Sequence, residues 1–581
     1  MVNLTIDNRK VQVEDGTTIL QAAESIGIYI PQLCYWKDLN EVGACRMCVV
    51  EVKGNDRLPT ACDTLVHEGM EVYTDSSRVV SARKINLRLI MSQHNLDCKN
   101  CIRTQNCVLQ DLFIKLKVNA RPYTIKLERN RVDLASPLSR EADKCVKCLR
   151  CVQVCDKIQR MHVWDVLGIG SRVTVGTTGN VLLSQSNCTY CGQCVTHCPV
   201  GALTARDDTI HVQEVLGNSN ITVIALIDPT VADAWAELLE RRENSISLKC
   251  LVASLHRIGF KYVFNSSVGY DLAAIEVSNE LVGRLSTPMD YRKPIFSSVC
   301  SGSAKFLKSQ FPEFTPGFLT AKSPQQMLGS VVRNYFVPRH SLNPQNVCIV
   351  SIGPCMVKKI FSGKEIFTSV YGVSDVDYFL TTRELYRLFK VLKFQLNDSL
   401  EDDFDSPFVL GSRLAFECPL DEGFTRAVLC SINNCCDRDI VPITVVHNCI
   451  GGQQWKEVTV RFSKLKEVRV AIASGLGNAR ALLEDIQTEK VGYDFVDIRA
   501  CPGGCISGGG QPIHNGVDFK ARRITQVNHL ASLSSVLFPL DSNSVEEIYD
   551  QWLGKPMSEK AIEFLHTDHL SWSVMDTRDK D

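Results

Sequence analysis

The chain has 581 residues, which at about 150 residues per domain predicts roughly four domains. Its 64 basic and 65 acidic residues leave a net charge of -1, which excludes a strongly basic nucleic-acid surface and a self-repelling acidic tail. No apolar run reaches the roughly 18 residues of a membrane helix, and residues 1–7 lack a signal-peptide layout. We therefore expect a cytoplasmic protein with no membrane span and no nucleic-acid partner.

The unusual feature of the composition is its 26 cysteines, fifteen of which precede residue 200. Disulfides are a poor explanation in a chain without an export signal, because the cytosol keeps thiols reduced. Four groupings before residue 200 have the spacing of metal ligands. The cysteines therefore predict metal–sulfur chemistry.

The first grouping is Cys34, Cys45, Cys48 and Cys62. A β-hairpin is predicted before it from the alternating apolar residues of 2–13, and a helix from the apolar spacing of 17–26. Two strands, a helix and a cysteine-bearing loop resemble a [2Fe-2S] ferredoxin domain, although the spacing differs from the plant type. A structural zinc site is the alternative.

The second grouping is His94, Cys98, Cys101 and Cys107. Its position just before three cysteines favours His94 as the fourth ligand of a [4Fe-4S] cluster. One imidazole in place of a thiolate removes a negative charge and tends to raise the reduction potential. Zinc bound by three cysteines and one histidine is the alternative.

The third and fourth groupings are an internal repeat of the pattern C-x2-C-x2-C-x3-C. This is the two-cluster ferredoxin signature, in which the last cysteine of each run ligates the other cluster. One [4Fe-4S] cluster is therefore predicted at Cys145, Cys148, Cys151 and Cys198, and another at Cys188, Cys191, Cys194 and Cys155. The four N-terminal centres would form a row in sequence order that moves single electrons.

From about residue 219 the pattern changes to apolar, β-branched strands alternating with helices. Strands are predicted over 221–227, 347–352 and 468–473, and helices over 231–239 and 382–394. This alternation is typical of parallel α/β layers. A dinucleotide-binding loop at Gly475-Leu476-Gly477 is disfavoured, because the third glycine and the acidic partner are missing.

Four of the remaining cysteines lie in loops of distinctive composition: Cys300, Cys355, Cys501 and Cys505, the last two among glycines that would let the backbone approach an inorganic centre. The chain resembles the large, multi-cluster [FeFe]-hydrogenases over nearly its whole length. The resemblance is carried by these loops, by the order of the clusters and by the segments 321–326, 474–478 and 554–567. The resemblance implies that the four cysteines hold the [4Fe-4S] half of an H-cluster, and that Cys505 bridges to a di-iron unit. It also implies cofactor contacts from Lys358, Ser323, Gln325 and Arg499.

The implied fold class is α/β (α+β overall), with ferredoxin-like iron–sulfur domains before a large hydrogenase-like α/β domain. We expect a [2Fe-2S] domain at 1–78, a His/Cys3 [4Fe-4S] domain at 79–125 and a two-[4Fe-4S] domain at 126–210. An H-cluster domain at 211–525 and a small-subunit-like tail at 526–581 complete the chain.

The sequence departs from the family where protons would move. Val299 replaces the family's relay cysteine, Val277 its glutamate, Leu319 its serine and Phe361 a further glutamate. Lys358 and the second relay carboxylate, Glu280, are retained, whereas Gly353 and Arg499 each replace a methionine of the family's loops. Aliphatic side chains cannot carry a proton, and losing one positioned acid typically costs about 10²–10⁴ in rate.

The leading hypothesis is an electron-transfer subunit with one [2Fe-2S] and four [4Fe-4S] clusters and a weakened or absent hydrogen site. An active hydrogenase and a redox or hydrogen sensor are the alternatives. No flavin or nicotinamide motif is visible, so we expect a hetero-oligomer with flavin-bearing NAD(P)H dehydrogenase-like subunits, formate dehydrogenase or ferredoxin as donors. A further metal site at Cys435, Cys436 and Cys449 stays open.

Overall fold

The computed structural model describes residues 1–104, 106–118, 123, 127–128, 131–239, 247–286, 294–362, 365–394, 400–433, 445–448, 454–462, 467–514 and 518–572. Cys435, Cys436 and Cys449 lie outside these ranges. The hypothesis of a metal site at these three cysteines therefore remains a prediction.

The N-terminal domain is a four-stranded sheet with the order β2-β1-β4-β3. Its strands are β1 (Val2–Ile6), β2 (Arg9–Val13), β3 (Glu51–Val52) and β4 (Glu71–Tyr73). The predicted hairpin is confirmed by the antiparallel pairing of β1 with β2, and the predicted helix by α1 (Ile19–Ser25). Thr18 begins α1 with a capping box, which satisfies two otherwise unpaired backbone donors.

Short elements separate this domain from the C-terminal two-thirds. They are α2 (Ser77–Met91), α3 (Val108–Leu116), β5 (Leu138–Arg140), α4 (Arg150–Gln153), β6 (Trp164–Leu167), β7 (Thr174–Thr177), α5 (Gln193–Thr196) and β8 (Leu203–Ala205). β5 pairs with β8 and β6 with β7, both antiparallel. The pairing of β5 with β8 brings the two cysteine repeats together.

The first C-terminal sheet is fully parallel, with the order β10-β9-β12-β13. Its strands are β9 (Thr222–Ile227), β10 (Tyr262–Asn265), β12 (Val347–Gly353) and β13 (Tyr378–Thr381). The two strands predicted at 221–227 and 347–352 are confirmed, as is the parallel α/β arrangement. One face packs on α6 (Thr209–Leu216), α7 (Val231–Leu238), α8 (Leu248–Ile258) and α13 (Thr382–Val391).

The second sheet has the order β11-β17-β16-β15-β14. Its strands are β11 (Ile295–Phe296), β14 (Val445–Asn448), β15 (Gln454–Arg461), β16 (Glu467–Ser474) and β17 (Phe495–Arg499), of which β11, β17 and β16 are parallel. One continuous core joins the two sheets through α9 (Ser267–Leu285), α11 (Pro324–Val331), α14 (Arg413–Glu417) and α15 (Gly423–Asn433). The opposite face meets α10 (Ser301–Gln310), α16 (Leu476–Gln487) and the two-repeat domain.

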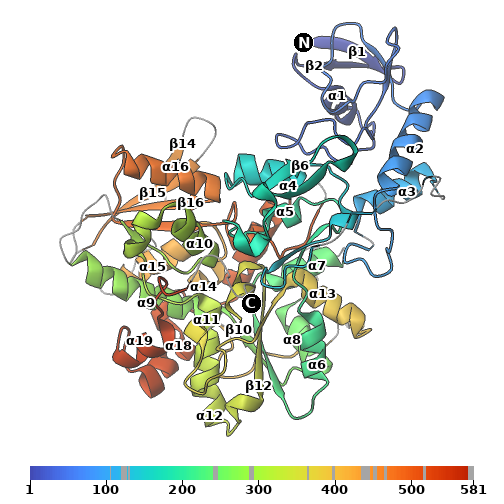
Figure 1. Ribbon diagram of the computed structural model, residues 1–581. Helices are drawn as coiled ribbons and strands as arrows, with labels where there is room; N and C mark the ends of the chain where they lie inside the picture. The colour runs from blue at the N-terminus through green and yellow to red at the C-terminus, as the bar shows by residue number, and fades with distance from the viewer. Residues whose placement is uncertain are drawn as a thin grey trace.

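The last helices are α17 (Lys520–Ser532), α18 (Asn543–Ile548) and α19 (Glu559–Leu565). Helices α18 and α19 lie against this core (Figure 1), whereas α17 packs on Phe416 of α14. Figure 1 also shows the N-terminal sheet set apart from the two C-terminal sheets, with the short cysteine-bearing elements between them. Within the ranges that the structure describes, no helix combines the length and apolarity needed to cross a membrane.

One buried carboxyl joins α9 to α14. Ser412, which begins α14, donates its backbone N–H (2.7 Å) and its hydroxyl (2.5 Å) to the Asp271 carboxyl group. Burial nevertheless raises the pKa of Asp271 from 3.8 to about 7. The folded chain therefore binds this proton more tightly than the unfolded chain does.

We predict that this carboxyl destabilises the fold as pH rises. Because the pKa of Asp271 is higher in the folded chain, its proton stabilises the fold at low pH, and this stabilisation is lost as pH rises toward the folded pKa. The free energy of unfolding should therefore fall by about 2 kcal/mol as pH rises from about 5.5 to 7. Asp271→Asn should flatten that loss in anaerobic thermal unfolding, whereas Asp550→Asn, at an exposed carboxyl, should not. An unchanged slope in the Asp271 variant would contradict the assignment.

Candidate metal centres

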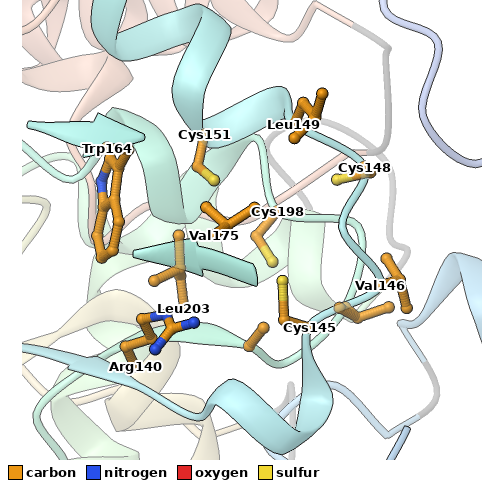
Figure 2. Close-up of a pocket in the computed structure, with 12 residues that line it drawn as sticks. Arg140, Cys145, Val146, Cys148, Leu149, Cys151, Trp164, Val175, Cys198 and Leu203 are labelled. Carbon is orange, nitrogen blue, oxygen red and sulfur yellow. The ribbon is translucent and has the colours of Figure 1, made fainter. Parts of the chain in front are cut away.

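The structure brings the last cysteine of the second repeat to the first three cysteines of the first. Cys145, Cys148, Cys151 and Cys198 line one pocket together with Trp164 and Leu203. Figure 2 shows the four thiols facing a common space, with Arg140 at its edge. This is the crossed arrangement that the repeat predicts, and we call it the third site.

The fourth site combines the last cysteine of the first repeat with the first three cysteines of the second. Cys155, Cys188, Cys191 and Cys194 line a second apolar pocket, which also touches Trp164. Both repeats make the same turn: Leu149 (φ +67) and Gly192 (φ +76) are left-handed at equivalent positions. Leucine rarely adopts this conformation, so the first repeat keeps it at a cost of roughly 1–2 kcal/mol.

The first site gathers its four cysteines inside the N-terminal domain. The backbone N–H of Cys45 donates to the Cys34 sulfur at 3.5 Å, and the thiol of Cys48 to the Cys62 sulfur at 3.3 Å. All four side chains are buried. The hairpin, α1 and the cysteine loop thus close around the predicted [2Fe-2S] ligands.

The second site lies between α2 and α3. His94 and Cys107 are buried, and Cys98 and Cys101 are half-buried. The charge of buried Arg103 interacts electrostatically with the thiols of Cys198, Cys107 and Cys101. The second site therefore adjoins the third. A Cβ on Gly201 would lie 2.8 Å from the Cys101 sulfur, which explains a glycine at this contact.

The third site also adjoins the first. The Asn40 side-chain amide donates to the backbone oxygens of both Cys34 (2.7 Å) and Cys148 (2.9 Å). The expected single row in sequence order is therefore wrong: the first and second sites both meet the third. The reason is that α4 packs on the loop after Cys34 while the α2–α3 region packs on the loop after Cys198.

The fifth set of cysteines follows the carboxyl ends of parallel strands. Cys300 comes after β11, Cys355 after β12, and Cys501 and Cys505 after β17. Ligand sites in open α/β sheets typically lie at this edge. Burial raises the pKa of the Cys501 thiol well above its ordinary value, and the neighbouring thiols of Cys355, Cys505, Cys191 and Cys300 add to the shift.

The fourth and fifth sites are in direct contact. A Cβ on Gly509 would lie 2.6 Å from the Gly192 Cα and 2.9 Å from the Cys191 oxygen. A Cβ on Gly504 would lie 2.5 Å from the Pro419 oxygen. These two glycines therefore permit close packing of protein on protein around the fifth site.

The five sets of residues fit iron–sulfur clusters. No disulfide joins the cysteines in the described part of the chain. Among the same residues, no three His, Cys, Asp or Glu side chains form a group that could hold a single metal ion. Bound clusters would supply one-electron redox chemistry, while the chain sets burial, charge and hydrogen bonding around them.

The three apolar replacements of relay residues belong to one hydrophobic core. Val277 and Leu319 are fully buried and Val299 is almost so, and all three lie in the core between the two sheets. Phe361 packs in the other core, with ring centroids 4.8 Å from Phe367 and 5.6 Å from Trp572. None of these positions offers a titratable group.

The retained carboxylate Glu280 is turned toward the C-terminal tail. It accepts hydrogen bonds from Thr320 N–H (2.9 Å) and Arg284 (2.7 Å). His566 lies 2.8 Å from the Thr320 hydroxyl and 3.0 Å from the Glu276 carboxylate, which also accepts from Tyr549. The sequence interpretation missed Glu276 and His566, because nothing local links residues 290 positions apart.

Lys358 and Gln325 lie in one buried polar network. Lys358 donates to the Gln325 side-chain oxygen, and the Gln325 amide donates to Asp228 at 3.1 Å and Tyr270 at 3.3 Å. Tyr270 donates to Asp228 at 3.0 Å. Ser323 is outside this network, since its hydroxyl donates to Gln326.

Asp228 explains one of the departures. A Cβ on Gly353 would lie only 3.1 Å from the Asp228 Cβ. The family's methionine at position 353 would need the space that this carboxylate side chain occupies. Asp228 is a site residue that the sequence interpretation missed; the break in apolar character after β9 was the available signal.

Arg499 brings a positive charge to the fifth site. It is 4% exposed, its Nε donates to Asp497 at 3.2 Å, and its guanidinium lies 5.1 Å from the Phe424 ring centroid. Asp497 raises the pKa of Arg499 against its burial, and the thiols of Cys505 and Cys300 act in the same direction. Its Nη2 has no hydrogen-bond partner among the residues that the structure describes.

The fold and sites define an iron–sulfur oxidoreductase, and comparison with known families supports this class. The models described as "Iron only hydrogenase large subunit, C-terminal domain" and "Iron hydrogenase small subunit" match residues 221–509 and 517–572. Models of a 2Fe-2S cluster-binding domain, the NADH-ubiquinone oxidoreductase-G iron–sulfur region and a 4Fe-4S dicluster domain match residues 1–77, 83–122 and 144–202.

Individual relatives extend over almost the whole chain. The NADP-reducing hydrogenase subunit HndD of Solidesulfovibrio fructosivorans is 33% identical, covering 98% of this chain and 99% of that relative. Iron hydrogenase 1 of Clostridium pasteurianum is 29% identical, covering 97% and 99%. A solved [FeFe]-hydrogenase structure, from work on oxygen inactivation of the H cluster, is 27% identical with a TM-score of 0.56, covering 62% of this chain and 98% of that chain. The chain belongs to the iron-only, or [FeFe], hydrogenase family.

The crossed pairing predicts which cluster each cysteine serves. Cys198→Ser should remove the magnetic signal of the third site and leave that of the fourth, although Cys198 belongs to the second run. Anaerobic iron quantitation and electron paramagnetic resonance (EPR) measure both effects. Cys348→Ala, at a buried cysteine of β12, should retain all clusters. Loss of the fourth signal alone would contradict the pairing.

Proposed function

We propose that this protein is an electron-transfer subunit of a redox complex, carrying one [2Fe-2S] and four [4Fe-4S] clusters. Its fifth site turns hydrogen over weakly or not at all. The observation that carries this proposal is the burial of Val277, Val299 and Leu319 in one continuous apolar core. The domain boundaries and the ligand sets given above are part of the proposal.

Proton delivery needs titratable groups within hydrogen-bond reach of one another. Three of the relay positions carry aliphatic side chains, all of which lie in one apolar core. Each loss typically costs about 10²–10⁴ in rate, and losses in series compound. The carboxylates that survive nearby, Glu280 and Glu276, are bound to Thr320, His566 and Tyr549 instead.

The charges around the fifth site support electron storage. Arg499 is buried, and a guanidinium keeps its charge at any pH of interest. A fixed positive charge stabilises the more negative, reduced state of a nearby cluster. The positive charge of Lys358 likewise favours negative sulfur, because it opposes the burial that raises the pKa of the Cys355 and Cys505 thiols.

A partner subunit would supply the flavin and nicotinamide binding for which no motif is visible in the sequence, and the chain's relatives indicate its class. A flavin-bearing NAD(P)H dehydrogenase-like subunit is the first candidate donor, and similarity to a protein named an NADP-reducing hydrogenase subunit supports it. Similarity of residues 83–122 to the NADH-ubiquinone oxidoreductase-G region points the same way. Formate dehydrogenase and ferredoxin are the other donors that we propose.

An active hydrogenase is the second candidate. Lys358 and the four cysteines Cys300, Cys355, Cys501 and Cys505 are all present, which is the set that the family uses to hold an H-cluster. Infrared spectroscopy after maturation, with hydrogen evolution from a reduced dye, separates the two candidates. Our proposal expects weak or no carbonyl and cyanide bands; strong bands with brisk evolution would establish the hydrogenase instead.

Arg499 provides a quantitative test of electron storage. Arg499→Met should lower the ratio of reduced to oxidised fifth cluster at a fixed potential by on the order of tenfold, because a buried positive charge is lost. Potentiometric EPR titration measures the ratio. Arg461→Met, at an exposed arginine on β15, is the control and should leave it unchanged. An equal shift in both variants would show that the effect is not local.

A further inference from the structure

The contact between the first and third sites is made by a buried arginine. Arg150 begins α4, lies between Cys148 and Cys151 in sequence, and is 3% exposed. Its Nε donates to the backbone oxygen of Cys34 at 3.0 Å, and its Nη2 donates to that of Tyr35 at 2.8 Å. A side chain of the two-repeat domain therefore binds the ligand loop of the N-terminal domain directly.

Two further side chains hold this arginine in place. The Arg150 guanidinium lies 5.2 Å from the Trp36 ring centroid, close enough for a cation–π contact. Fully buried Asn40 donates to the same Cys34 oxygen that Arg150 binds, and also to the oxygen of Cys148. Hydrogen bonds thus connect the ligand loops of the two sites through one carbonyl group.

The charge of Arg150 has no carboxylate beside it. Its hydrogen-bond acceptors in the described residues are both carbonyl oxygens, and its Nη1 has no hydrogen-bond partner. The thiols that act on its charge belong to both sites: Cys148 and Cys198 to the third, Cys34 and Cys45 to the first. Because a buried cation without a counterion is costly, this one requires negative charge from the cluster sites themselves.

We propose that Arg150, positioned by Asn40 and Trp36, links the first and third sites: it stabilises the reduced state of both clusters and forms part of the route between them. This inference rests on the proposed function, since it requires clusters at both sites. In the transfer step one electron leaves the reduced [2Fe-2S] site, which is oxidised, and enters the oxidised [4Fe-4S] site, which is reduced. No proton or bond moves.

The position of Arg150 matters for this step. A charge close to only one site would favour the electron there and oppose its passage. A guanidinium that acts on the thiols of both sites stabilises the electron before and after transfer, so the electron crosses with little change in this interaction. Arg150 thereby raises both potentials without trapping the electron at one site.

Three variants test the link. Arg150→Gln removes the charge, and Arg150→Lys keeps it but loses the fork that binds two carbonyl groups. Lys157→Gln is the matched control, because Lys157 also donates to this loop, at the Leu39 oxygen (2.9 Å), but is exposed, so that solvent and salt screen its charge. Each is made in the full chain with assembled clusters and titrated anaerobically with dithionite, using EPR.

In Arg150→Gln the ratio of reduced to oxidised cluster at a fixed potential should fall on the order of tenfold at the first and third sites, which is about 59 mV for a one-electron couple. The fourth and fifth sites serve as internal controls and should not shift. In Arg150→Lys both ratios should stay within about threefold of the unmodified protein, while freeze-quench transfer from first to third site slows at least about tenfold. Lys157→Gln should match the unmodified protein.

Unchanged ratios in a fully iron-loaded Arg150→Gln would overturn the proposal. If that variant does not assemble, Arg150→Lys decides: an unchanged transfer rate would overturn it equally. Failure of the proposed function looks different, because then the unmodified protein itself would lack the EPR signals of the first or third site.

Discussion

The burial of thiol groups in sets is the constraint on which the rest of this structure depends. Burial raises the pKa of Cys151, Cys194 and Cys501, and neighbouring thiols raise it further, so the protein alone favours neutral sulfur. A bound cluster needs thiolates, and its iron provides the positive charge that makes them stable. Cluster assembly and the final packing of these loops are therefore one thermodynamic event.

This constraint also bears on three of the buried cations. They stand beside the cysteines of the sites: Arg103 at the second and third sites, Arg150 at the first and third, and Arg499 at the fifth. Each carries a charge that no solvent screens. Clusters that gain an electron become more negative, so such cations favour electron uptake throughout the chain.

Much of the fold could be predicted from local patterns, whereas the spatial order of the sites could not. The hairpin at 2–13, the helix after it and the strands at 221–227, 347–352 and 468–473 follow periodicities of a few residues, and all are present. The spacing of the cysteines in the repeat predicts the crossed ligand sets of the third and fourth sites. The meeting of the first and third sites depends instead on Asn40 and Cys148, which are 108 positions apart. No pattern within one segment records such a contact.

The departures at the fifth site are consistent with one another once their contacts are known. Asp228 takes the space that a larger residue at Gly353 would need, and it binds Tyr270 and Gln325 rather than pointing to solvent. Glu276 and Glu280 hold His566 and the tail, so the carboxylates nearest the apolar core now serve packing.

A buried polar group left unpaired costs about 1–3 kcal/mol. At Asp228, Glu276 and Glu280 the polar groups are paired, and at Val277, Val299 and Leu319 the apolar groups are packed. The surroundings of the fifth site therefore combine hydrogen-bonded carboxylates with a closely packed apolar core.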